Sequence, residues 1–141
     1  MYDFNLLVST SRYNEPNCKA ELWFTIMMCG DKYPIISDLE FIGLITASTT
    51  LDAKQLIRDI RKIVEKDPKY FQYILKIIPI DYVCETNVEI IDEIVKRNYK
   101  KYINKGDSFK ITLNRRKNDL IDRDKFIRKI ASNINNDVDL D

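Results

Sequence analysis

A cluster of basic residues followed by a helix start is the part of this sequence with recognisable chemistry. Arg115, Arg116 and Lys117 stand together, and a helix opened by Asp122 follows them. Arginine side chains bind phosphate oxygens through paired hydrogen bonds, and a helix N-terminus offers free backbone N–H groups to an anion. The pattern therefore predicts contacts with phosphates, which position a nucleic acid without reading its bases. An exposed turn with Arg–Asp pairs inside the helix is the alternative explanation.

Charge is segregated around this cluster. The window Lys96–Lys129 holds 13 of the 23 Lys and Arg residues but only 4 of the 22 Asp and Glu residues, so it carries +9 in a chain of net charge +1. The segments on either side are acidic. Such a concentration of positive charge is expected of a surface that meets phosphates, although runs of Lys and Arg are also common on solvated helix faces.

Two predicted helices and one strand position these cations. Apolar spacing predicts a helix over Val88–Lys105, a strand over Ser108–Leu113, and a last helix that Asp122 caps. The helical period turns the apolar side chains inward and the cations outward. One strand with two helices does not close a sheet core. We therefore expect this αβα unit either to complete its core on the first unit or to be incomplete, truncated at its C-terminal end.

The first part of the chain has a different pattern. Residues Phe4–Thr10 alternate as a half-buried strand, and the following apolar segments predict the order strand, helix, strand, strand, helix, strand. This is the βαββαβ order of a ferredoxin-like sandwich. We therefore predict an α+β fold (α/β sandwich), with a ferredoxin-like domain over residues 1–82 and a second domain over residues 83–141.

Several local expectations accompany this assignment. Asn14 is predicted to cap the first helix, and Thr49 or Thr50 the second. Trp23 and the two methionines that follow it are expected in the core. Gly43 lies inside a predicted strand, which suggests a bulge or the close approach of another backbone.

Residue types also exclude several activities. The chain has no histidine and only three glycines, so Ser-His-Asp chemistry and glycine-rich nucleotide loops are absent from it. Its three cysteines form no CxxC pair, which argues against a disulfide framework or a zinc site. No apolar run reaches the ~18 residues of a membrane span, and the N-terminus does not resemble a signal peptide. We expect a cytoplasmic protein without cofactor, metal or membrane partner, and without catalytic activity.

Several segments in order resemble a known family. They are residues 6–12, 30–31, 41–45, 73–80, 109–116 and 137–140. Together they are similar to a THUMP-domain protein, of the stand-alone kind related to the adaptor for tRNA N4-acetylcytidine formation. The resemblance spans essentially the whole chain, although Tyr13 stands where relatives often carry glycine.

The resemblance implies an N-terminal ferredoxin-like domain followed by a THUMP domain, which together bind structured RNA, chiefly tRNA. It also implies that catalysis belongs to a partner, here a tRNA acetyltransferase, or to another domain. The predicted RNA-binding residues are Arg12, Arg115, Arg116, Lys117, Arg123, Lys125, Arg128 and Lys129, with Lys100, Lys101 and Lys105 as secondary candidates.

Two other functions fit the same residues. The chain is then either the RNA-binding part of a larger tRNA-modifying enzyme, for thiolation or methylation, or a protein-interaction module whose basic face docks an acidic surface. Salt dependence of tRNA binding separates RNA binding from protein docking, because neutralised phosphates release counterions.

Overall fold

The computed structural model describes residues 3–114 and 121–138 of the chain. It divides into two compact units, Met1–Val83 and Cys84–Asp141. Each unit has its own hydrophobic core. Arg115, Arg116 and Lys117, which the sequence predicts to bind phosphate, lie outside the described residues.

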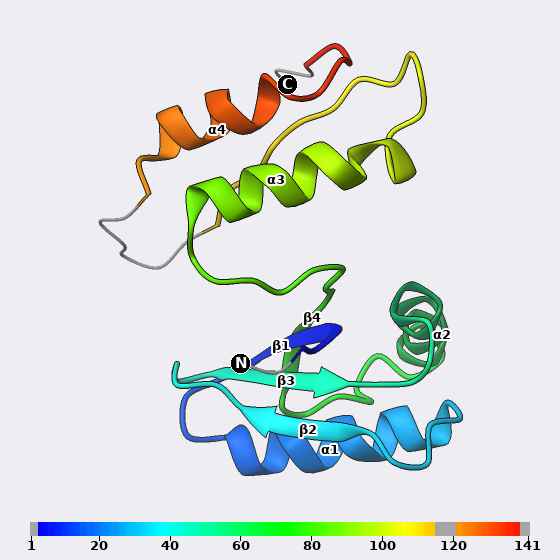
Figure 1. Cartoon of the computed structure of the whole chain (residues 1–141). Coiled ribbons are helices and arrows are strands. Elements are labelled where there is room, and N and C mark those ends of the chain that lie inside the picture. Colours follow the sequence, from blue (N-terminus) through cyan, green and yellow to red (C-terminus); the bar gives the residue numbers. More distant parts are fainter. Residues whose placement is uncertain (1–2, 115–120, 139–141) are drawn as a thin grey trace. The chain divides into compact units, whose positions relative to one another are not determined.

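The N-terminal unit is an antiparallel sheet with two helices (Figure 1). Its elements in chain order are β1 (Leu6–Thr10), α1 (Glu15–Met28), β2 (Ile35–Asp38), β3 (Leu44–Ser48), α2 (Ala53–Lys66) and β4 (Ile74–Pro79). The four-stranded sheet has the order β2-β3-β1-β4, and each neighbouring pair is antiparallel. This is ferredoxin-like topology, and the predicted α+β class is confirmed.

The core of this unit lies on one face of the sheet. Leu6 and Val8 of β1 pair in register with Ala47 and Ile45 of β3, and all four side chains are fully buried. These strand residues face the same way because side chains two residues apart on a strand share a face. Both helices contribute to the same cluster, for example through Leu22 of α1. Alternation in the sequence therefore predicted the buried face of β1 correctly.

Gly43 explains how the β2–β3 hairpin meets β1. Its φ is +83°, and a Cβ at this position would lie 2.9 Å from the carbonyl oxygen of Thr10. Thr10 N–H donates to the Gly43 carbonyl at 3.0 Å, and Gly43 N–H donates to Glu15 at 2.9 Å. The expected close approach of another backbone is confirmed, but Gly43 immediately precedes β3 instead of lying inside it.

Asn14 stands at the N-cap position of α1 as predicted, whereas the cap of α2 differs from the expected one. The side chain of Asn14 accepts no bond from α1 and donates instead to Ser11 Oγ at 2.6 Å. The cap of α2 is Asp52, which accepts from Gln55 N–H at 2.8 Å, so the prediction of Thr49 or Thr50 was wrong. Thr49 has another role, because its hydroxyl donates to the carboxylate of Asp31 at 2.7 Å.

Asp31 ties the end of the α1 segment to the loop before α2. It is only 5% exposed, and its oxygens also accept from the backbone N–H groups of Tyr33 and Thr50, at 3.0 and 3.1 Å. Burial by itself raises the pKa of this carboxyl. The hydrogen bonds to Thr49, Tyr33 and Thr50 stabilise the charged form and lower the pKa overall.

The C-terminal unit contains α3 (Val88–Asn98), a 3₁₀ turn η1 (Tyr99–Lys101) and α4 (Arg123–Ala131). Helix α3 ends at Asn98 and is therefore shorter than the predicted helix Val88–Lys105. Asn98 Nδ2 donates to the Ile94 carbonyl at 2.8 Å, and such a local bond competes with continuation of the helix. Asn87 caps α3, accepting from the N–H groups of Glu89 and Ile90.

The predicted strand over residues 108–113 is reduced to a single parallel bridge in the described part of the chain. Phe109 pairs with Val138, and Phe109 N–H donates to the Asp137 carbonyl at 2.9 Å. A strand is stabilised by its lateral ladder, and one bridge does not make a ladder. The core cluster of this unit is small and contains Ile121, Phe126 and Ile130, with partly buried side chains of α3 packed against them, and Phe109 is buried as well.

Candidate nucleic-acid interface

Cations of helix α4 point into solvent because the apolar face of the helix packs against α3. Phe126 and Ile130 are buried one turn apart, against Val88 and Val95 of α3. Asp122 accepts from Lys125 N–H at 3.0 Å and so caps the helix as predicted. At 100° per residue, the buried pair directs Lys125 and Arg128 to the opposite side, where both are exposed.

The four predicted cations of α4 are not equivalent. Arg123 donates through Nη2 to the Leu113 carbonyl at 2.8 Å, which ties the helix start to the preceding segment. Lys129 pairs with Glu89 of α3. Lys125 and Arg128 form no ion pair with any residue that the structure describes, so their charges are available to a ligand.

A second group of cations lies at the end of α3. Lys100, Lys101 and Lys105 are exposed, and none of them forms an ion pair within residues 3–114 and 121–138. Lys100 and Lys105 line a hollow of about 470 Å³. The other lining residues are Tyr99, Ile103, Asn104, Asn135 and Asn136.

Helices α3 and α4 lie side by side (Figure 1). Lys129 meets Glu89 and Asn133 meets Asp92, so the two helices run in the same direction. Residues after α4 are thereby brought to the end of α3. Asn136 completes the contact by donating to the carbonyls of Asn104 and Asp107, at 3.0 and 2.8 Å.

The lining of this hollow matches the chemistry of a nucleotide. Lysine supplies point charges for phosphate oxygens, and amide groups both donate and accept hydrogen bonds as sugar and base edges do. An aromatic ring such as that of Tyr99 offers a surface on which a base stacks, an interaction of about 1–3 kcal/mol. We refer to Tyr99, Lys100, Asn104, Lys105, Asn135 and Asn136 as the asparagine–lysine hollow.

Sequence reasoning found the lysines of this hollow but missed its neutral members. Tyr99, Asn104, Asn135 and Asn136 are absent from the residues that the sequence predicted to bind RNA. A signal was present, because three asparagines occur at positions 133, 135 and 136. Their meeting with Asn104, about thirty residues earlier, depends on how the two helices pack.

Arg12 belongs to the other unit. It is exposed in the turn between β1 and α1, beside Tyr13, whose φ of 70° is unusual for a side chain of this size. The structure therefore groups those predicted residues that it describes into three sets. They are the cations of α4, the lysines at the end of α3, and Arg12 alone in the N-terminal unit.

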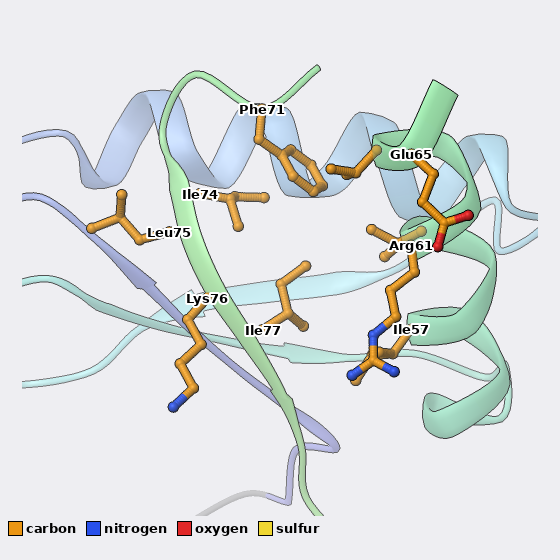
Figure 2. A pocket seen from close by; sticks show the side chains of 10 residues that line it. Ile57, Arg61, Glu65, Phe71, Ile74, Leu75, Lys76 and Ile77 are labelled. Carbon is orange, nitrogen blue, oxygen red and sulfur yellow. The ribbon is translucent and has the colours of Figure 1, made fainter. Parts of the chain in front are cut away.

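A hollow in the N-terminal unit has a different character. Figure 2 shows it between α2 and β4, with a volume of about 360 Å³. Its lining is mostly aliphatic and aromatic, with three charged side chains. The lining residues are Ile57, Ile60, Arg61, Val64, Glu65, Phe71, Ile74, Leu75, Lys76 and Ile77. Such a surface suits an apolar side chain better than a nucleotide.

In residues 3–114 and 121–138, no group of three or more Cys, Asp or Glu side chains is placed to hold a metal ion. Within those same ranges, no helix is long and apolar enough to span a membrane.

Comparison with known proteins gives one match. Residues 85–141 match the model of the THUMP domain, which covers the C-terminal unit and the asparagine–lysine hollow. No curated protein and no solved structure matches the chain. THUMP domains are generally RNA-binding modules in tRNA modification, so the free cations described above lie in the part of the chain for which RNA binding is expected.

Proposed function

We propose that this chain is a non-catalytic module that binds structured tRNA and presents it to a tRNA-modifying enzyme. The partner that best fits the resemblance is a cytidine acetyltransferase. A cytoplasmic location accords with this role and with three free cysteines. The observation that supports the proposal most is the asparagine–lysine hollow, because it combines unpaired cations, amides and an aromatic ring within the THUMP match.

The distribution of charge supports RNA over an acidic protein surface as the ligand. Lys100 and Lys105 flank neutral amide side chains. A sugar–phosphate backbone can both accept hydrogen bonds from an amide and donate to it, whereas a cluster of carboxylates can only accept them. Lys125 and Arg128 form a second contact area on the same unit. Two basic areas on one small unit suit a folded RNA, which is recognised by shape and backbone more than by sequence.

Residue chemistry supports the non-catalytic role that we propose. The chain has no histidine, the commonest general base, and its three glycines cannot form a cofactor loop. Burial raises the pKa of the Cys18 thiol to about 11, so this cysteine is a poor nucleophile at neutral pH. The role of this chain is then to position RNA, and the chemistry belongs to another protein.

The test is tRNA binding by a double variant of the hollow. Replacing Lys100→Ala and Lys105→Ala should weaken tRNA binding by about 1–3 kcal/mol, roughly 5- to 150-fold, because hydrogen bonds to charged groups are among the stronger ones. The slope of log Kd against log salt should also fall by about 0.7–0.9 for each lost phosphate contact.

A matched control removes the same charge elsewhere. Lys62 and Lys66 are exposed on α2, and Lys62→Ala with Lys66→Ala leaves the hollow intact. We expect tRNA affinity within about twofold of the unmodified protein. Equal losses in both double variants would reduce the proposal to general polyanion binding, and unchanged affinity in the hollow variant would remove the RNA site from this hollow.

A further inference from the structure

Helix α1 has an outer face that is apolar, which sets it apart from an ordinary surface helix. Its buried side is formed by Cys18, Leu22, Thr25 and Ile26. Trp23, Phe24 and Met28 are nevertheless 43%, 49% and 58% exposed. The expectation that Trp23 and the methionines belong to the core was therefore wrong for Trp23 and Met28, while Met27 is partly buried.

The outer face carries no charge at all. At 100° per residue, seven side chains lie on the side of α1 opposite the middle of the buried group Cys18, Leu22, Thr25 and Ile26, and none of them is ionisable. They are Pro16, Asn17, Ala20, Trp23, Phe24, Met27 and Met28. We call these seven residues the α1 face.

The charged residues of α1 point to its flanks and are engaged with its own unit. Glu15 accepts from Gly43 N–H at 2.9 Å, and Lys19 pairs with Asp38 of β2 at 2.8 Å. Glu21 accepts from three backbone N–H groups, at residues 72, 73 and 74, at 2.8–3.1 Å. No charged side chain of the helix is left to solvate the α1 face.

Helix α2 has a charged outer surface, in contrast to the uncharged α1 face. It also has 14 residues and packs against the same core cluster as α1. Its outward residues are charged, among them Arg58, Lys62 and Lys66. Contiguous exposed apolar surface on a soluble protein commonly marks an interaction site, and Trp, Phe and Met are enriched there.

We propose that the α1 face pairs with the α1 face of a second copy of this chain, in an antiparallel, two-fold symmetric contact. A two-fold contact places the same patch on both partners. Because the face carries no charge, such pairing opposes no like charges. This interaction goes beyond the proposed RNA binding and uses the other unit.

The order of large and small residues supports a second copy as the occupant. The N-terminal half of the face is small, with Pro16, Asn17 and Ala20, and its C-terminal half is large, with Trp23, Phe24 and the methionines. In an antiparallel pair, the large half of each helix meets the small half of the other. Ala20, near the centre, lets the helix axes approach closely.

The expected dimer is weak and reversible. An aromatic side chain buries 150–250 Å² when fully covered, so a half-exposed face of this size offers on the order of 400 Å². A standard interface buries about 800 Å² on each partner. We therefore expect weak association that increases with protein concentration between the micromolar and the millimolar range.

Analytical ultracentrifugation across that range tests the proposal. The mass should rise from 16.7 kDa towards twice that value. Trp23 is the sole tryptophan in the sequence, so its emission should shift to the blue on association. A protein that stays monomeric up to millimolar concentration would overturn the proposal and leave the α1 face to a different protein.

A charge pair across the two-fold axis gives the sharper test. Ala20→Glu and Ala20→Arg should each remain monomeric, because like charges then meet at the centre, and mixing the two variants should restore the dimer. Ala20 is exposed, so the helix should keep its melting temperature. Lys62→Glu on α2 is the control and should dimerise normally. Dimerisation that survives either single Ala20 variant, or no recovery on mixing, would contradict the two-fold contact.

Discussion

The two units of this chain use their residues for different purposes. Met1–Val83 buries a cluster of ten apolar residues on one face of a four-stranded sheet, each no more than 8% exposed. In Cys84–Asp141, the described core cluster has three such residues, and exposed cations surround it. The first unit is therefore built for stability, whereas the second has little core and much charge, which favours a role in binding.

The two units should differ most in how much free energy of unfolding is lost when a buried isoleucine is replaced by alanine. Ile26 and Ile130 are 0% and 3% exposed, one in each unit. Ile26→Ala should lower the free energy of unfolding by about 4–5 kcal/mol, whereas Ile130→Ala should cost about 2 kcal/mol, because a small cluster relaxes more readily around a cavity. Urea denaturation followed by circular dichroism measures both. Equal costs would show that the two cores are equally well packed.

Cations of the two units should differ in their contribution to RNA binding. Lys125→Ala with Arg128→Ala should weaken tRNA binding by about 1–3 kcal/mol, since both side chains are exposed and unpaired in the described structure. Lys129→Ala should have less effect, because Lys129 already pairs with Glu89. Arg12→Ala in the N-terminal unit should cost about 1 kcal/mol. Fluorescence anisotropy with labelled tRNA compares the three, and no effect of Arg12 would confine the RNA site to the C-terminal unit.

Acid should act on the first unit through Asp31. The folded-state pKa of this carboxyl lies below its ordinary value of 3.8, so its contribution to stability is complete above that value and is lost as pH falls through the folded pKa. Asp31→Asn should lower stability by about 1–2 kcal/mol at pH 7 and flatten the loss of stability below about pH 4. Thermal melts from pH 2 to pH 7 provide the measurement. Parallel pH profiles for the variant and the unmodified protein would rule out this role.

Thiol reactivity is the smallest effect and distinguishes the units without changing their stability. Cys18 is fully buried, and burial is the main cause that raises its pKa to about 11, whereas Cys84 in the second unit is partly exposed. A disulfide reagent at pH 7 should modify Cys84 first and Cys18 only on unfolding. Reductant and chelator should leave the melting temperature unchanged. Fast modification of Cys18 would show that the core opens more readily than its packing suggests.

Local patterns in the sequence were sufficient for most of the first unit. Alternation of Leu6 and Val8 predicted β1 and its buried face, and the order of elements predicted the ferredoxin-like topology that the sheet has. Asp122 was correctly assigned as a cap. These features depend on neighbours within a few residues, whose spacing the sequence gives directly.

Prediction was less accurate where one residue had several possible partners. Thr49 had the right side chain for a cap, but its hydroxyl is bound to Asp31, and Asp52 caps α2. Residues 108–113 alternate as a strand does, yet only Phe109 pairs within the described chain. The outcome in each case depended on a residue distant in sequence, and local propensity does not include that information.

By itself, the sequence determined the segregation of charge, the likeness to a THUMP protein and the absence of histidine chemistry. Only the tertiary structure decided which cations are free. Parallel packing of α3 and α4 paired Lys129 with Glu89 and brought Asn135 and Asn136 to Lys100 and Lys105. Tertiary packing also decided which side of α1 is exposed, because two opposite sides of this helix are apolar and its hydrophobic period does not indicate which of them meets the sheet.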